Sequence, residues 1–138
     1  MPIEPPPNEA PLFTVVAAII QHGGRVLICQ RRKGDTFGLK WEFPGGKLEP
    51  GETFLHCLQR ELQEELSIKI GSVERVEFQT ARYDDGGHFS VAYCYISDFD
   101  GEPKNNVFEE IRWVEPRELA AFDILEGNKE IIAQLTHE

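Results

Sequence analysis

The sequence predicts an α/β protein in which helices cover both faces of a central mixed β-sheet, an α/β/α sandwich. Three observations support this fold class. Short apolar runs rich in β-branched residues lie on both sides of one amphipathic helical segment at residues 53–66, and a second helical pattern closes the chain. The 138 residues are enough for one ordinary domain and too few for two.

The strands are identified as apolar runs that end at turn-forming residues. Residues 13–20 (FTVVAAII) and 25–30 (RVLICQ) flank a turn-like HGG and are expected to form a hairpin. In chain order, strands are expected at residues 13–20, 25–30, 41–46, 73–82, 88–99 and 108–114, with turns at 84–87 and 100–106. Alternate side chains of the fifth strand should share one face of the sheet: Phe89, Val91, Tyr93 and Tyr95.

The helices follow from a period of three to four residues. Within residues 53–66 the apolar side chains form a single stripe, made of Phe54, Leu55, Leu58, Leu62 and Leu66. Glu49, Glu52 and Thr53 suit the start of this helix. A short helix is expected at residues 115–122, and a terminal helix at residues 128–135.

Composition and charge limit the possible partners. The formal net charge of −10 argues against a protein that wraps duplex nucleic acid, because phosphates need a basic surface. A small phosphorylated ligand remains compatible, since a bound divalent cation reverses the local charge. No apolar run approaches the roughly 20 residues needed to cross a bilayer, so no membrane partner is expected.

The N-terminus and the cysteines indicate the organisation and the compartment. Residues 1–12 are proline-rich and lack a secretory signal, so we expect a flexible lead-in to a single domain at residues 13–138. Cys29, Cys57 and Cys94 are odd in number and widely spaced, without a CxxC pair. They are interpreted as buried thiols in a reducing cytoplasm.

The helix at residues 53–66 crowds three carboxylates within five residues, at Glu61, Glu64 and Glu65. Positions three and four apart share a helix face, so Glu61 neighbours the other two, and like charges at this spacing are unfavourable. A solvated acidic face is the simpler interpretation. The alternative is a cation site, because crowded carboxylate oxygens are the ligands that Mg²⁺ and Mn²⁺ prefer.

The spacing around this helix resembles the Nudix box, G-x5-E-x7-R-E-U-x-E-E-x-G-U, where U is a bulky aliphatic residue. Gly46, Glu52 and the segment from Arg60 to Ile68 match every fixed position except one, because Ser67 stands where the family has glycine. Serine lacks the free access of glycine to positive φ, so the end of the helix could differ. The resemblance extends over residues 13–136 to the MutT-type nucleoside triphosphate pyrophosphohydrolases.

This resemblance implies a Nudix fold and a role for each box residue. Glu61, Glu64 and Glu65 would be catalytic metal ligands for Mg²⁺, with Mn²⁺ as a substitute, and Glu61 is also a candidate general base. The backbone carbonyl of Gly45 would be a further ligand. The structural members of the box are Gly46, Glu52 and Arg60.

Members of this family often add a carboxylate shortly before a tryptophan-containing strand. When Trp113 is aligned with that tryptophan, Glu109 and Glu110 lie near the position, and Glu109 is the candidate fifth ligand. Two adjacent glutamates that enter a strand are more often plain surface residues, which is the alternative interpretation.

Six residues bear on the choice of substrate. Arg32 occupies the place of a strand-end arginine that faces the ligand in similar proteins, although a solvated loop is the alternative. Asn128 aligns with an asparagine that binds the purine edge in 8-oxo-dGTP diphosphatases, and its amide could also cap the terminal helix. Phe37, Trp41, Phe78 and Tyr83 could stack a base or belong to the core.

The expected reaction is therefore hydrolysis of 8-oxo-dGTP or a related deoxynucleotide to the monophosphate and pyrophosphate, which would sanitise the nucleotide pool. Three alternatives remain open: a pyrophosphohydrolase of cytidine triphosphates or another nucleoside diphosphate derivative, a nucleotide sensor without catalysis, and a metal-binding structural domain. A monomer or a homodimer is expected.

Overall fold

The computed structural model describes residues 13–82 and 88–136, and the expected lead-in at residues 1–12, the expected turn at 84–87 and Tyr83 lie outside the described residues. Seven of the nine described strands form one sheet, and β5 and β8 form a separate pair. The strands are β1 (Thr14–His22), β2 (Arg25–Gln30), β3 (Trp41–Glu42), β4 (Gly45–Lys47), β5 (Lys69–Ile70), β6 (Arg75–Arg82), β7 (His88–Ile96), β8 (Phe99–Asp100) and β9 (Glu110–Val114).

Strand β1 lies at the centre of the sheet, whose order is β3-β2-β1-β7-β6. Along one edge it pairs in parallel with β7. Along its other edge it pairs antiparallel with two strands in turn, first with β4 at residues 15–17 and then with β2 at residues 21–22. Parallel and antiparallel pairs in one sheet confirm the predicted mixed sheet. The change of partner along β1 brings the β3–β4 segment against the middle of the sheet.

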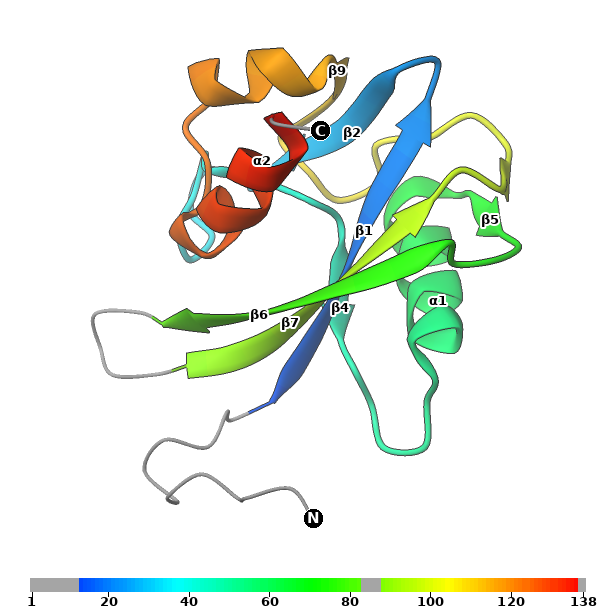
Figure 1. Ribbon diagram of the computed structural model, residues 1–138. Coiled ribbons are helices and arrows are strands. Elements are labelled where there is room, and N and C mark those ends of the chain that lie inside the picture. The colour runs from blue at the N-terminus through cyan, green and yellow to red at the C-terminus, as the bar shows by residue number, and fades with distance from the viewer. Residues whose placement is uncertain (1–12, 83–87, 137–138) are drawn as a thin grey trace.

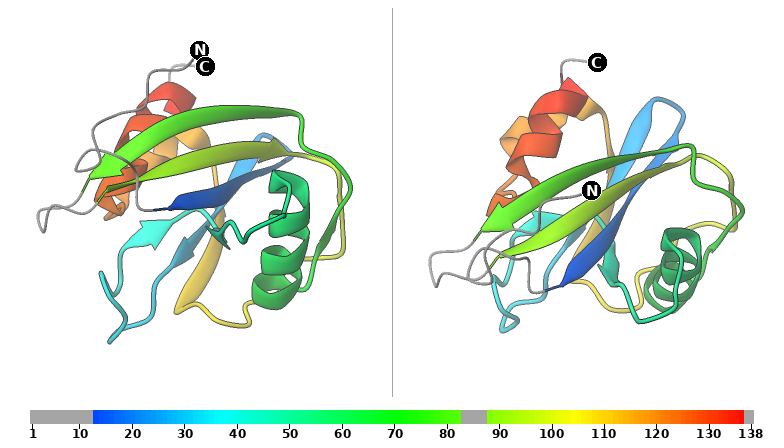
Figure 2. Two further views of the ribbon diagram at one scale, coloured as in Figure 1. Left: turned by 90° about the horizontal axis from the view of Figure 1, so that it is seen from below. Right: turned by 60° about the horizontal axis from the view of Figure 1, so that its bottom comes forward.

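Helices cover the two faces of the sheet, as Figures 1 and 2 show. Helix α1 (Phe54–Leu66) packs on one face, where its apolar side chains join alternate residues of β1, β2 and β7. The opposite face is covered by the 3₁₀ helices η1 (Pro116–Ala121) and η2 (Glu126–Asn128) and by α2 (Lys129–Thr136). The predicted α/β/α sandwich is therefore confirmed. Val91, Tyr93 and Tyr95 share the core under α2, with Phe89 packed against it.

The structure differs from the sequence prediction in three short elements. The segment expected as a helix at 115–122 is a 3₁₀ helix, which Pro116 starts and a Glu115–Glu118 capping box holds. The strand expected at 88–99 divides into β7 and β8, and β8 pairs with β5, which the sequence does not reveal. Two-residue strands are too short to show a periodicity. Among the described residues, no helix is long and apolar enough to cross a membrane.

Candidate active site

Helix α1 presents the candidate carboxylates at the edge of its buried stripe. The helix begins after Thr53, whose hydroxyl accepts a hydrogen bond from the His56 N–H at 3.1 Å. Its fully buried side chains face the sheet: Cys57, Leu58, Leu62 and Leu66. Glu61 and Glu65 lie beside this stripe and are partly buried, whereas Glu64 is exposed. The apolar contacts therefore hold two carboxylates against the loop that precedes the helix.

Arg60 ties the preceding loop to the helix. Its guanidinium donates to both carboxylate oxygens of Glu52, from Nε at 3.0 Å and from Nη2 at 2.9 Å, and also to the Lys47 carbonyl at 3.3 Å. The hydrogen bond from Arg60, together with one from the Glu49 N–H, lowers the pKa of Glu52 to about 2. Arg60 also donates to Glu61 Oε1 at 2.6 Å, so one side chain orients both the loop and a candidate ligand.

The two glycines that precede Lys47 lie directly against the carboxylates. The Gly45 N–H donates to Glu65 Oε1 at 3.2 Å. A Cβ atom added at Gly46 would lie 2.5 Å from Glu61 Oε1, so only glycine leaves room for this carboxylate. Gly45 has φ of 152°, and a Cβ there would overlap the Val16 carbonyl oxygen. Both positions require glycine because a Cβ atom would collide, at Gly46 with the Glu61 side chain and at Gly45 with the backbone of strand β1.

The electrostatics of the site suit a cation. Burial, together with the negative charges of Glu61, Glu42 and Glu64, raises the pKa of Glu65 to about 8, against the opposing effect of the Gly45 N–H. A divalent cation beside these oxygens would offset the repulsion. Over residues 13–82 and 88–136, no three His, Cys, Asp or Glu side chains are grouped closely enough to hold a metal ion. Glu61, Glu64 and Glu65 are thus neighbours along one helix, and of the three only Glu65 lines the cavity described next.

A cavity of about 350 Å³ adjoins these groups. It combines polar groups of the loop and of α1 with apolar side chains from both halves of the fold. Its lining includes Arg31, Phe37, Glu42, Phe43, Gly45, Gly46, Glu65, Phe89, Val91, Phe108, Leu125, Gly127 and Asn128. A mostly apolar cavity with a few convergent polar groups is typical of a small-molecule site.

Asn128 lines this cavity and is the buried polar side chain of the core among the described residues. Its Oδ1 accepts from the Phe43 N–H at 3.3 Å, and its Nδ2 donates to the Tyr93 hydroxyl at 2.8 Å. Tyr93 in turn donates to the Gly127 carbonyl at 2.9 Å. Asn128 therefore joins η2 to the sheet, and these two bonds leave one donor and one acceptor of the amide for a ligand.

Three candidate substrate-binding residues lie outside the cavity lining, namely Arg32, Trp41 and Phe78. The structure places Arg31 in the lining and leaves Arg32 exposed outside it. Arg31 binds Glu42 through Nη1, at 3.1 Å to each carboxylate oxygen. The sequence analysis did not predict this pair, although Glu42 lies in the strand expected at residues 41–46. Among the expected stacking aromatics, Phe37 lines the cavity, whereas Trp41 is buried and Phe78 lies 64% exposed on β6.

Glu109 and Glu110 also lie outside the lining. The exposed Glu109 carboxylate accepts from the Lys33 N–H at 3.3 Å, and Glu110 pairs with Arg112. We expect the double variant Glu109→Gln, Glu110→Gln to lose at most about tenfold in turnover, because neither carboxylate faces the cavity. Steady-state pyrophosphate release would measure this. A loss as large as that of a box glutamate would restore Glu109 as a metal ligand.

Ser67 occupies the position where the sequence departs from the box. It ends α1 in the left-handed conformation, with φ of 56° and ψ of 36°. The Asn106 side chain donates to Ser67 Oγ at 2.9 Å and to the Glu64 carbonyl at 3.0 Å. Backbone N–H groups of Lys104 and Asn106 bind the Leu66 and Glu65 carbonyls. The loop at residues 104–106 thus caps the C-terminal end of α1, where the family pattern has glycine.

Comparison with known proteins supports this description. Residues 11–135 match the family model described as NUDIX domain. An 8-oxo-dGTP diphosphatase from Haemophilus influenzae is 33% identical over 128 residues, which cover 92% of this chain and 93% of the relative. A CTP pyrophosphohydrolase from Escherichia coli is 35% identical over 114 residues, with 82% and 83% covered. The solution structure of the E. coli ORF135 protein matches with a TM-score of 0.80 and 28% identity, covering 94% of this chain and 91% of that one.

Fold, helix and cavity together define a Nudix hydrolase, a class of enzymes that generally needs a divalent metal ion. The match over nearly the whole chain shows that the protein belongs to the NUDIX domain family. The resemblance found in the sequence is confirmed.

Proposed function

We propose that the protein hydrolyses a nucleoside triphosphate to the monophosphate and pyrophosphate with Mg²⁺, or with Mn²⁺ in its place. The observation that carries this proposal is the contact between the Gly45–Gly46 loop and the carboxylates of Glu61 and Glu65, at the wall of a cavity that also holds Asn128. The relatives named as 8-oxo-dGTP diphosphatase and CTP pyrophosphohydrolase support the reaction class.

Each residue of the site has a task in this reaction. Glu61, Glu64 and Glu65, with the Gly45 carbonyl, would hold the metal, and when bound it would neutralise the polyphosphate and acidify water. Arg60 fixes the Glu61 carboxylate at 2.6 Å, and this carboxylate is the proposed base that takes the proton of the attacking water. The apolar lining excludes bulk water from the ligand.

We propose 8-oxo-dGTP or a related deoxynucleotide as the substrate, which makes the protein a sanitiser of the nucleotide pool. Asn128 supports a purine, because it lines the cavity and keeps one donor and one acceptor, which match the edge of a guanine-like base. The relative that acts on CTP keeps cytidine triphosphates as the second candidate. Three free buried cysteines support the proposed location in a reducing cytoplasm, and a monomer or a homodimer remains the proposed assembly.

The test is pyrophosphate release from a panel of nucleotides. We expect release from at least one triphosphate in Mg²⁺ or Mn²⁺ and none in excess chelator, because the carboxylates repel an unneutralised polyphosphate. The panel contains 8-oxo-dGTP, dGTP, dATP, CTP and dCTP. Binding without turnover would identify a nucleotide sensor, and undiminished turnover in chelator would refute the metal requirement.

The base preference can be tested at Asn128. Asn128→Ala removes the acceptor of the Phe43 N–H and the amide group that donates to the Tyr93 hydroxyl, so we expect about 1–3 kcal/mol lower stability. If the amide also binds a purine, kcat/KM for the purine should fall roughly 5- to 150-fold, with a much smaller loss for a pyrimidine triphosphate. Melting curves and kinetics on both substrates measure the two effects. Equal kinetic losses for both bases would show that Asn128 only joins η2 to the sheet.

A further inference from the structure

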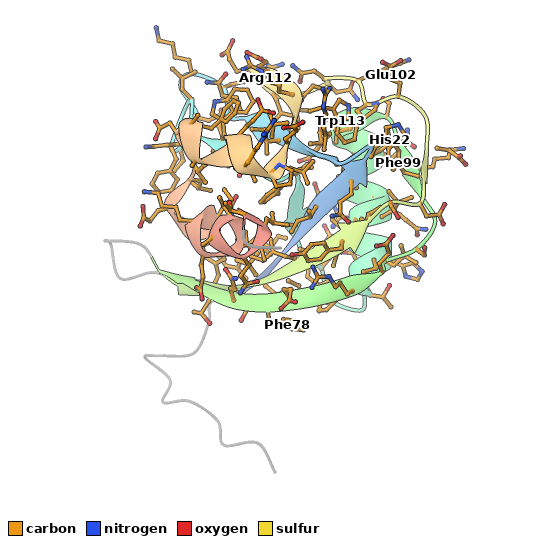
Figure 3. All side chains as sticks on the ribbon, turned by 45° about the horizontal axis from the view of Figure 1, so that its top comes forward. His22, Phe78, Phe99, Glu102, Arg112 and Trp113 are labelled. Carbon is orange, nitrogen blue, oxygen red and sulfur yellow. The ribbon has the colours of Figure 1, made fainter. Side chains whose placement is uncertain are left out.

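Gln79 on strand β6 is a half-buried residue whose amide atoms are buried, and the site described above does not use it. Its neighbour Phe78 points to the α1 face, where it contacts Phe54 with ring centroids 5.7 Å apart and lies on the outer side of the strand (Figure 3). Successive side chains of a strand alternate, so Gln79 points to the opposite face, under α2. There its partner across the sheet is Val91, which lines the cavity.

The amide of Gln79 makes no hydrogen bond. Both Nε2 and Oε1 are buried, and neither has a partner in the structure. The large majority of buried side-chain polar atoms in proteins are paired, because desolvation without a partner is unfavourable. The contrast with Asn128 is direct, since that buried amide uses both its oxygen and its nitrogen. A buried amide that keeps its full bonding capacity is suited to an external partner.

The position of Gln79 identifies where that partner would lie. Strand β6 packs against η2, which contributes Gly127 and Asn128 to the cavity lining. On β7, Val91 stands opposite Gln79, and the diagonal neighbour Tyr93 bonds to the Gly127 carbonyl. Gln79 therefore stands beside Val91 and η2, which line the cavity, and is not itself one of the lining residues. Its three side-chain torsions allow a shift towards a ligand.

We propose that Gln79 is a second specificity-determining residue, whose amide hydrogen-bonds the base of the bound nucleotide. The ligand class is a nucleobase with a lactam edge, where a carbonyl acceptor adjoins an N–H donor, because a carboxamide pairs with both groups. 8-Oxoguanine has two such edges, and the protein offers two amides, Asn128 in the cavity lining and Gln79 beside the lining residue Val91. This inference rests on the proposed function and deepens it.

Gln79→Met tests the proposal, because methionine keeps the length of the side chain and removes its polar atoms. We expect the melting temperature in chelator to rise by about 2–6 °C, since an unpaired buried amide is lost. At the same time, kcat/KM for the triphosphate that the wild type prefers should fall roughly 5- to 150-fold, with a smaller loss for a triphosphate whose base lacks a lactam edge, such as dATP. Titration of the corresponding monophosphate in chelator should show the same selective loss of affinity.

Thr80→Met is the matched control, because Thr80 is the next residue of β6, is exposed and points to the opposite face. It should leave both the melting temperature and the selectivity unchanged. Unchanged base selectivity in Gln79→Met overturns the proposal, whatever happens to the melting temperature. A higher melting temperature without a kinetic effect would show that the amide is unpaired and does not contact the substrate. A wild type that hydrolyses none of the panel would instead overturn the proposed function.

Discussion

Replacing Glu65 by Gln is expected to reduce pyrophosphate release by roughly 10²–10⁴-fold while the fold stays intact. Gln keeps the size of the side chain and its acceptor for the Gly45 N–H, so the contact at 3.2 Å survives. It removes the negative charge that a divalent cation needs. Glu64→Gln should show a comparable loss, although Glu64 is exposed and its stability effect should be close to zero.

The same variant should be as stable as the wild type or more stable in metal-free buffer, with a defined dependence on pH. The pKa of Glu65 is raised from 4.5 to about 8 in the folded protein, chiefly by burial. Between these values the folded state binds a proton that the unfolded state has released, so the wild type loses stability as pH rises. Glu65→Gln lacks this group, and its advantage should therefore be absent below pH 4.5 and largest at about pH 8 and above.

Melting curves in chelator at several pH values, together with turnover in Mg²⁺, would measure both effects. Gln63→Ala is the control, because Gln63 is an exposed neighbour on the same helix. Retained turnover combined with a large loss of stability would show that Glu65 is structural and would remove it from the proposed ligands.

The adjacent glycines should respond in opposite ways to the same substitution. Gly45→Ala places a Cβ against the Val16 carbonyl and 2.9 Å from Ala17 Cα, at φ of 152°, so strand β1 itself would have to move. We expect a loss of about 2–6 kcal/mol from overpacking and backbone strain combined. Gly46→Ala meets only the end of the Glu61 side chain, which can swing away at little cost in stability.

The expected outcome is therefore an unstable Gly45→Ala protein and a stable Gly46→Ala protein with little turnover, because the displaced carboxylate of Glu61 leaves both Arg60 and the proposed metal. Chemical denaturation and pyrophosphate release distinguish the two cases. Gly51→Ala serves as a comparison, since Gly51 also has a positive φ but no atom lies within 4 Å of the added methyl group. A Gly46→Ala enzyme with normal turnover would contradict the proposed role of Glu61.

Residues with a strong local pattern were predictable from the sequence. The apolar stripe at residues 53–66 predicted both ends of α1 (Phe54–Leu66) to within one residue. Strand β2 was predicted at the residues where it is observed. The box spacing also indicated that Glu52 and Arg60 act together, and the structure joins them by two hydrogen bonds. These features depend on contacts between residues close in sequence, which a periodicity or a motif records.

The remaining features depend on contacts between distant strands. Arg31 meets Glu42 because β2 pairs with the two-residue strand β3, a register that no periodicity shows. Gln79 could not be distinguished from other polar residues of β6, since its burial depends on η2, which is far away in the chain. The role of Arg32 was assigned by position in a family pattern, and the neighbouring Arg31 occupies the lining instead.

The hydrogen bond between the Asn106 and Ser67 side chains has a consequence for protein engineering. Consensus substitution would restore glycine at position 67, which removes a strained left-handed serine but also deletes the acceptor of the Asn106 amide. Substitutions at the two positions should therefore be epistatic, so the effect of the pair on stability should differ from the sum of the two single effects. Asn106 also follows Asn105, which binds both backbone groups of Phe108 in the cavity lining. An evolutionary path that exchanges Ser67 for glycine thus passes through the loop that shapes the nucleotide cavity.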